Sequence, residues 1–260
     1  MSTFIARTAL ALSLLLSACT RLESEVVSFH GRDVEIVDAG DGPTTVVFEA
    51  GLGDDWHHWN RVASDLSDDT RVFAYSRPGY GDSDATTTPR DPGHIVEELR
   101  ELLASQDIPP PYILVGHSFG GTYMELFARS HPDEVAGLVL VDSRPSDFLA
   151  ECESAKLDQC GVPSATVKAT GGVFAAEYTA FAEASEEMMA AGTFGAYPVR
   201  VMTATRRAGK SKDRMALWSS MHASLAEEAE DGVQIRVHGG HYLQVFHERK
   251  VAAVIRGVLP

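Results

Sequence analysis

Short apolar runs recur along the chain, separated by turn residues and by stretches in which apolar residues have helical spacing. Runs of this kind, bounded by Gly and Pro, predict buried strands. These strands are expected at residues 44–48, 71–75, 112–115, 135–141, 197–203 and 233–237. Two further strands, 25–29 and 32–38, would form a hairpin around His30-Gly31. Helical spacing is found at residues 56–66, 92–103, 122–130, 216–229 and 241–258.

The order of these elements predicts the fold class. Strands alternate with helices, which implies an α/β fold with a mostly parallel central sheet and helices on both faces. Residues 143–196 depart from the alternation, because they are rich in Ala, Glu and aromatic residues and contain no strand pattern. We interpret them as a helical insertion that caps the sheet.

The stretch from Tyr112 to Ser130 carries the first candidate for chemistry. A strand pattern leads into Gly116-His117-Ser118-Phe119-Gly120-Gly121, and a helical pattern follows. The motif G-x-S-x-G is weak alone, but a strand before it and a helix after it are the context that it requires. Ser118 is therefore a candidate nucleophile on a sharp turn, where crowding favours glycine.

Residues 1–18 are expected to be a signal peptide. Arg7 precedes an apolar run, Ala9 to Leu16, which is too short to span a bilayer as a helix but typical of a secretory signal. The sequence Leu16-Ser17-Ala18-Cys19 resembles the lipobox of bacterial lipoproteins, in which the Cys becomes the lipid-modified first residue. This resemblance implies a protein anchored by acyl chains in the bacterial cell envelope, on its periplasmic or extracellular face. The alternative is an ordinary signal peptide with a Cys near its end.

The charge, length and cysteine content of the chain limit its partners, its number of domains and its disulfide pairing. The net charge of −15 argues against nucleic acid as a partner. The 260 residues suffice for one α/β domain, here residues 19–260. Disulfides persist in exported proteins, and Cys152 and Cys160 lie close together in a polar segment, so we expect them to pair. Two free thiols, or a bond to another molecule, are the alternatives.

Five segments in order resemble the α/β-hydrolase fold superfamily, over roughly Val26 to Leu259. The segments are Glu49-Ala50-Gly51-Leu52-Gly53, Arg77-Pro78-Gly79-Tyr80-Gly81-Asp82-Ser83, the motif from Gly116 to Gly120, Leu138-Val139-Leu140-Val141-Asp142 and Gly239-Gly240-His241. The resemblance implies a catalytic triad in the order Ser, acid, His, so that His241 would be the base for Ser118. It also implies an oxyanion hole made by the backbone N–H groups of Leu52 and Phe119. Relatives often carry His-Gly where this chain has Ala50-Gly51.

The acid of the triad is ambiguous. Most members of the superfamily place it after the strand that is here 197–203, yet that position reads Ala204-Thr205-Arg206-Arg207. Asp213 is the first acid afterwards and looks better as the N-cap of the next helix. Asp142 directly follows the preceding strand, where ligand sites gather in parallel sheets. We favour Asp142 and keep Asp213 as the alternative.

The leading hypothesis is a lipid-anchored serine hydrolase that acts on small-molecule carboxylic esters through an acyl-enzyme. An amidase or peptidase would use the same residues, and a non-catalytic envelope-binding lipoprotein would use the fold alone. No cofactor is implied. His57 and His58 follow Asp54 and Asp55, but a surface position is favoured over a metal site.

Overall fold

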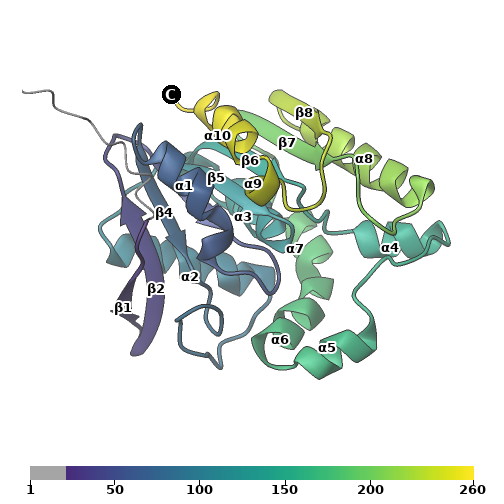
Figure 1. The fold of residues 1–260 in the computed structure, drawn as a ribbon, viewed down its shortest axis with the longest axis horizontal. Coiled ribbons are helices and arrows are strands. Elements are labelled where there is room, and N and C mark those ends of the chain that lie inside the picture. The colour runs from purple at the N-terminus through teal and green to yellow at the C-terminus, as the bar shows by residue number, and fades with distance from the viewer. Residues whose placement is uncertain (1–21) are drawn as a thin grey trace, which may run out of the picture.

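The computed structural model describes residues 22–260, which form one eight-stranded sheet flanked by helices (Figure 1). The expected signal peptide and Cys19 lie outside the described residues. Within residues 22–260, none of the helices has the length and apolar character needed to cross a membrane.

The eight strands occur close to where the apolar runs predict them. They are β1 (Glu25–Phe29), β2 (Arg32–Ala39), β3 (Thr45–Glu49), β4 (Arg71–Tyr75), β5 (Tyr112–His117), β6 (Val135–Val141), β7 (Pro198–Ala204) and β8 (Asp231–Val237). Their order across the sheet is β1-β2-β4-β3-β5-β6-β7-β8. The pairs β1–β2 and β2–β4 are antiparallel, and all other pairs are parallel. The predicted α/β fold with a mostly parallel sheet is confirmed.

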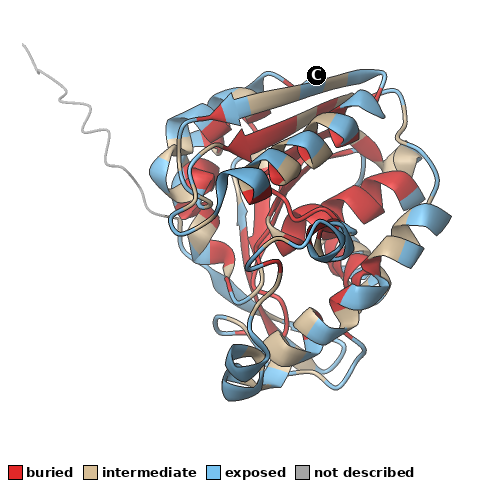
Figure 2. Cartoon of the chain, turned by 90° about the vertical axis from the view of Figure 1, so that its right-hand side faces the viewer, coloured by how far each residue is buried: buried red, intermediate tan, exposed pale blue. Residues whose placement is uncertain are grey.

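Helices cover both faces of this sheet. The main-body helices are α1 (Asn60–Leu66), α2 (Pro92–Ser105), α3 (Phe119–Ser130), α8 (Lys212–Glu227), α9 (Leu243–Phe246) and α10 (Glu248–Arg256). Successive strand residues point to opposite faces, so Val47 packs with α2 and α3, whereas Val46 and Phe48 pack with α1 and α10. Figure 2 shows the buried residues concentrated along the sheet and on the helix faces turned toward it. Two apolar layers therefore hold the sheet rigid, and its carboxyl edge can carry a site.

Between β6 and β7 the chain adds four α-helices, one short 3-10 helix (Phe181–Glu183) and no strand. The α-helices are α4 (Phe148–Ser154), α5 (Ser164–Thr170), α6 (Gly172–Ala180) and α7 (Ala184–Ala190). Figure 1 shows α5 and α6 standing away from the sheet, beyond its carboxyl edge.

Two helix predictions were wrong in detail. The pattern predicts one helix over 241–258, but His247 has a non-helical backbone (φ −136°, ψ 36°) that separates α9 from α10. The other helix begins at Lys212 and not at Ala216. Its N-cap is Ser211, whose side chain accepts a hydrogen bond from the N–H of Arg214 (3.2 Å), as serine caps do. Asp213 therefore lies in the first turn of α8 and does not cap it.

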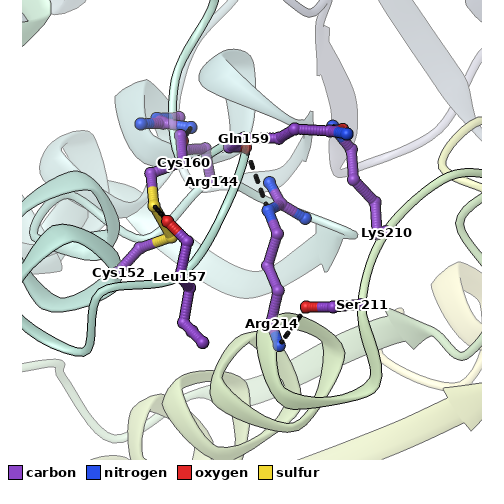
Figure 3. The surroundings of a disulfide bond; sticks show 8 residues. All are labelled: Arg144, Cys152, Leu157, Gln159, Cys160, Lys210, Ser211 and Arg214. Atoms are coloured by element: carbon purple, nitrogen blue, oxygen red, sulfur yellow. Dashed lines mark hydrogen bonds between the residues drawn. A yellow bond between two sulfur atoms is a disulfide. The ribbon is translucent and has the colours of Figure 1, made fainter.

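Cys152 and Cys160 form a disulfide that closes the start of the insertion (Figure 3). Their Cα atoms are 5.6 Å apart, within the usual range for a disulfide. The surroundings differ from the polar loop that the sequence indicates. Residues 148–154 form α4, and both cysteines are buried in a small apolar cluster with Phe148 and Trp218.

We expect the double substitution Cys152→Ala, Cys160→Ala to lower the free energy of unfolding by up to about 3 kcal/mol, because a short cross-link restricts the unfolded chain. Urea denaturation should measure the difference. Reductant should destabilise the wild type and leave the double variant unchanged. Non-reduced peptides in which these two residues are not linked would contradict the pairing.

Candidate active site

Ser118 lies on the sharp turn between β5 and α3. Its backbone (φ 54°, ψ −120°) falls where residues with a side chain are seldom found, so packing must hold it there. A Cβ at Gly116 would lie 2.4 Å from the carbonyl oxygen of Gly120, and a Cβ at Gly120 would lie 2.3 Å from that of Ala50. Only glycine allows the strand, the turn and the helix to approach so closely, which is the crowding that the sequence motif predicts.

Ser118, His241 and Asp142 form a continuous chain of hydrogen bonds. The Oγ atom of Ser118 is 3.0 Å from Nε2 of His241, and Nδ1 of His241 is 2.6 Å from Oδ2 of Asp142. With the proton on Nδ1, the ring donates to the carboxylate, and Nε2 is free to accept from the serine hydroxyl. Three residues from three separate loops at the carboxyl edge of the sheet thus meet in the order required for nucleophilic catalysis.

Asp142 is fully buried and is held on both carboxylate oxygens. Its Oδ1 accepts from the backbone N–H of Ala204 (3.0 Å) and from Nε1–H of Trp218 (2.8 Å). Burial alone would raise the pKa of this carboxyl, but the hydrogen bond from His241 and the charge of Arg207 hold the pKa well below its usual range. Asp142 is therefore a fixed anion.

Asp213, the alternative acid, is exposed in the first turn of α8. The structure brings Asp142 to His241 and leaves Asp213 at the surface. Asp142 reaches His241 because β6 ends beside β5, the strand that leads into Ser118.

Burial also sets the protonation of His241. Desolvation, and then the proximity of His117, lower the pKa of His241 to about 4, although the hydrogen bond to Asp142 acts in the opposite direction. The imidazole is therefore neutral at neutral pH, which is the form that can accept a proton from Ser118.

The loop after β3 brings Leu52 to the same place. Leu52 and Phe119, the two expected oxyanion donors, line one cavity together with Ser118 and His241. Ala50 stands where relatives often have His, so this position offers no polar side chain to the loop. Instead, the guanidinium of Arg77 donates to the carbonyl oxygens of Ala50 (2.7 Å) and Gly51 (2.8 Å).

Arg77 is itself held by two carboxylates in the interior. It contacts Glu49 at 2.5 Å and forms a two-point ion pair with Glu177 of α6, at 3.0 Å for each bond. Burial would lower the pKa of Arg77, but the charges of Glu177 and Glu49 raise it well above its usual value. One permanently charged group thus ties the expected oxyanion loop to the inserted helices.

The remaining histidines near the site have partners of their own. Nε2 of His117 is 3.1 Å from the carbonyl oxygen of His241, and its Nδ1 is 3.6 Å from Asp54. His58 lies 3.5 Å from the same carboxylate. Over residues 22–260, no three or more His, Cys, Asp or Glu side chains are grouped so that they could hold a metal ion.

The cavity at Ser118 has a volume of about 580 Å³, within the range of small-molecule sites. The insertion and α9 supply part of its wall. Its apolar lining residues are Leu52, Phe119, Val162, Phe174, Trp218 and Phe246. Its basic lining residues are Arg144, Arg207, Lys210 and Arg214.

Sequence reasoning did not single out Trp218, Arg77 or the basic residues of the cavity. Arg144 and Arg207 do follow the ends of β6 and β7, where ligand sites of parallel sheets gather, and that position could have drawn attention to them. Trp218 lies inside an ordinary helical pattern and offers no such signal.

Comparison with known proteins gives partial matches to curated relatives. A putative carbamate hydrolase, RutD, of Yersinia enterocolitica is 40% identical over 103 residues, which are 39% of this chain and 36% of that protein. An uncharacterized protein, YqjL, of Bacillus subtilis is 35% identical over 108 residues, covering 42% of this chain and 43% of that protein. The chain thus spans less than half the length of these relatives.

Similarity of fold extends over nearly the whole chain. The crystal structure of Cfl2 from Burkholderia cenocepacia superimposes with a TM-score of 0.69 at 21% identity, covering 94% of this chain and 98% of that one. The sequence model of the alpha/beta hydrolase fold matches residues 44–219. This range contains Ser118, Asp142 and the whole insertion, so the chain belongs to the alpha/beta hydrolase fold family.

Proposed function

We propose that this protein is a serine hydrolase that cleaves carboxylic esters through an acyl-enzyme intermediate. The observation that carries the proposal is the chain of hydrogen bonds from Ser118 through His241 to Asp142, at the wall of a cavity of small-molecule size. Membership of the hydrolase family supports the class of reaction.

In the first half of the reaction, Ser118 Oγ attacks the ester carbonyl carbon while Nε2 of His241 takes the hydroxyl proton. The imidazolium that forms is stabilised by the fixed charge of Asp142. The carbonyl oxygen gains negative charge, and the N–H groups of Leu52 and Phe119 are the donors assigned to it. Arg77 would keep the first donor in position, because it binds the two carbonyl groups that precede Leu52.

The first tetrahedral intermediate then collapses: the bond to the leaving alcohol breaks, His241 gives its proton to that alcohol, and the acyl group stays on Ser118. In the second half, His241 takes a proton from a water molecule, whose oxygen attacks the acyl carbon. Collapse of the second tetrahedral intermediate breaks the bond to Ser118 Oγ, which regains the proton from His241, and the acid is released. No step needs a group that this chain lacks.

The proposal also states which type of bond is cleaved, an ester and not an amide or a carbamate. The partial relative in Yersinia is named a putative carbamate hydrolase, and a carbamate is also cleaved by attack at its carbonyl carbon. A panel of matched acyl esters, amides and carbamates, assayed with wild type and a Ser118 variant, therefore tests the bond type. Ester turnover above amide and carbamate turnover is the expected result, and the reverse order would assign a different bond.

The substitution Ser118→Ala should lower kcat about a million-fold, because the triad acts as a unit. A fluorophosphonate should label wild-type protein at Ser118, detected by mass spectrometry of the modified peptide. Full activity in the Ala variant, or labelling at another residue, would contradict the role of Ser118.

The substitution Asp142→Asn should lower kcat about ten-thousand-fold, since an amide cannot hold the reactive tautomer of His241 or stabilise its cation. Asp213→Asn is the matched control and should keep nearly full activity, because Asp213 lies at the surface. Both variants are to be checked for folding by thermal melting. A large loss confined to Asp213→Asn would assign the acid to the other carboxylate.

We also propose that Cys19 carries acyl chains that hold the protein at a membrane of the bacterial cell envelope. The sequence Leu16-Ser17-Ala18-Cys19 supports this proposal, and stable anchoring needs more than one acyl chain. Cys19→Ser should move the protein from the membrane fraction to the soluble fraction in the bacterial host. A wild-type protein that starts at another residue and fractionates as soluble would rule out the anchor.

A further inference from the structure

Four basic side chains, Arg144, Arg207, Lys210 and Arg214, line the cavity at Ser118 in a chain whose net charge is −15. Arg144 and Arg214 are at least nine-tenths buried. Within residues 22–260, Asp54 is the one carboxylate that lines the same cavity, and it is engaged by His117 and His58. The cavity is therefore strongly basic where the rest of the protein is acidic.

Other buried arginines of this protein are neutralised by carboxylates. Arg77 pairs with Glu49 and Glu177, Arg90 with Glu98, and Arg129 with Glu125. Such pairing is the rule, because an unpaired buried charge costs several kcal/mol.

The arginines of the cavity break this rule. Arg144 and Arg214 have no carboxylate within ion-pair distance in the part of the chain that the structure describes. Arg207 has its Nε 3.7 Å from Asp142, which already binds His241. Each of these three arginines also has one buried guanidinium nitrogen without a hydrogen-bond partner, as Arg32 and Arg90 have elsewhere in residues 22–260. What sets Arg144 and Arg214 apart is the missing carboxylate.

Aromatic rings and carbonyl groups hold these arginines in place. The guanidinium carbon of Arg207 lies 4.3 Å from the ring centre of Trp218, and that of Arg214 lies 4.8 Å from the ring centre of Phe148. Nε of Arg214 donates to the carbonyl oxygen of Gln159 (3.1 Å), next to the disulfide. Figure 3 shows the Arg214 side chain reaching from α8 to this main chain. Arg214 is thus fixed in position without a carboxylate partner.

The pKa values agree with a lack of negative partners. Burial first, and for Arg214 the neighbouring Arg207, lower the pKa of Arg144 and of Arg214 to about 10. Burial and the two arginines 207 and 214 also lower the pKa of Lys210. Arg144 and Arg214 therefore stay charged at neutral pH, and each is close enough to Arg207 to be repelled by it.

The basic character continues beyond Arg207. A more open cavity of about 1130 Å³ lies between β7, β8 and α8 and shares Arg207 and Lys210 with the first one. It is also lined by Arg206, Lys212 and Arg236, and in the described residues no carboxylate lines it. An anion would be attracted from this side toward Ser118.

We propose that the substrate is an ester that carries an oxyanion, either a carboxylate or a phosphate, bound by Arg144 and Arg214 in the cavity of Ser118. The bound anion supplies the negative charge that Arg144 and Arg214 lack. Planar two-point contact with an oxyanion is what a guanidinium makes best. The proposal rests on the proposed ester hydrolysis for the reaction, but binding of the anion does not depend on turnover.

Binding is tested first in the Ser118→Ala protein by titration calorimetry. Glutarate and glycerol 3-phosphate are the carboxylate and phosphate probes, and glutaramide is the neutral control. One of the anions should bind and glutaramide should not. In the Ser118→Ala protein, the further substitution Arg214→Met should weaken binding of the anion about 10- to 100-fold, because hydrogen bonds from a charged group are lost. Arg214→Lys, which keeps the positive charge, should retain much of the affinity. Arg200→Met is the matched control, because Arg200 pairs with Asp231 at the opposite end of β7.

Turnover is tested next with matched esters and otherwise wild-type protein. The p-nitrophenyl ester of glutaric acid, with one free carboxylate, is compared with p-nitrophenyl pentanoate, and 4-acetoxybenzoate with 4-acetoxybenzamide. The anionic ester of at least one pair should have the higher kcat/KM, and Arg214→Met should abolish that preference through KM. Arg144→Gln provides a second test should Arg214→Met fail to fold.

The outcomes separate the two proposals. Anion binding without turnover of any ester would leave the anion site in place and overturn ester hydrolysis. Turnover of esters with no anion binding, and no preference for either anionic ester, would overturn the anion site alone. Binding that Arg214→Met and Arg200→Met weaken equally would also overturn it.

Discussion

The close approach of the start of α3 to the ends of three strands is the constraint on which the rest of the site depends. Gly120 lies against the carbonyl groups of Glu49 and Ala50 after β3, and a Cβ at Gly121 would come within 2.3 Å of Ser143 after β6. Because no side chain fits at either contact, three loops converge around Ser118. The loop after β3 brings Leu52, the loop after β6 begins with Asp142, and the turn after β5 holds Ser118 in its strained conformation, with Phe119 next to it.

A second requirement is that the loop carrying Leu52 keeps its shape. Asp54 of this loop lies 3.6 Å from His117, and Arg77 binds two consecutive carbonyl groups of the loop. Its charge is balanced by Glu49 and by Glu177, and Glu177 belongs to the insertion. The position of the cap and the geometry of the loop are therefore coupled through one guanidinium, and neither can shift without exposing a buried charge.

The sequence predicts the parts of this arrangement that are local. The strand–turn–helix around Ser118 and the Gly-Gly turn before His241 follow from short-range patterns, and both residues meet as expected. The catalytic roles remain predictions. The choice between Asp142 and Asp213 was open because no acid follows the strand after which most members of the superfamily place it. The side chain that holds Asp142 in place, Trp218, is 76 residues away in the sequence. Glu177 is 100 residues from Arg77. Periodicity within a segment carries no information about such distant pairs. It also does not reveal the break at His247, because the apolar residues on both sides of His247 keep helical spacing.

The distribution of buried charges supports the proposal about the charge of the ligand at this site. In the body of the protein each buried guanidinium that ties elements together is matched by a carboxylate, as Arg77 and Arg129 illustrate. Around Ser118, Arg144 and Arg214 are instead positioned by the ring of Phe148 and by main-chain oxygens beside the disulfide, which orient a cation but cancel none of its charge. The unpaired cations of this cavity are the basis of the proposal that the ligand brings a negative charge. Because Ser118 lines the same cavity of about 580 Å³, the proposal requires that one small molecule carry both the charge and the group that Ser118 attacks.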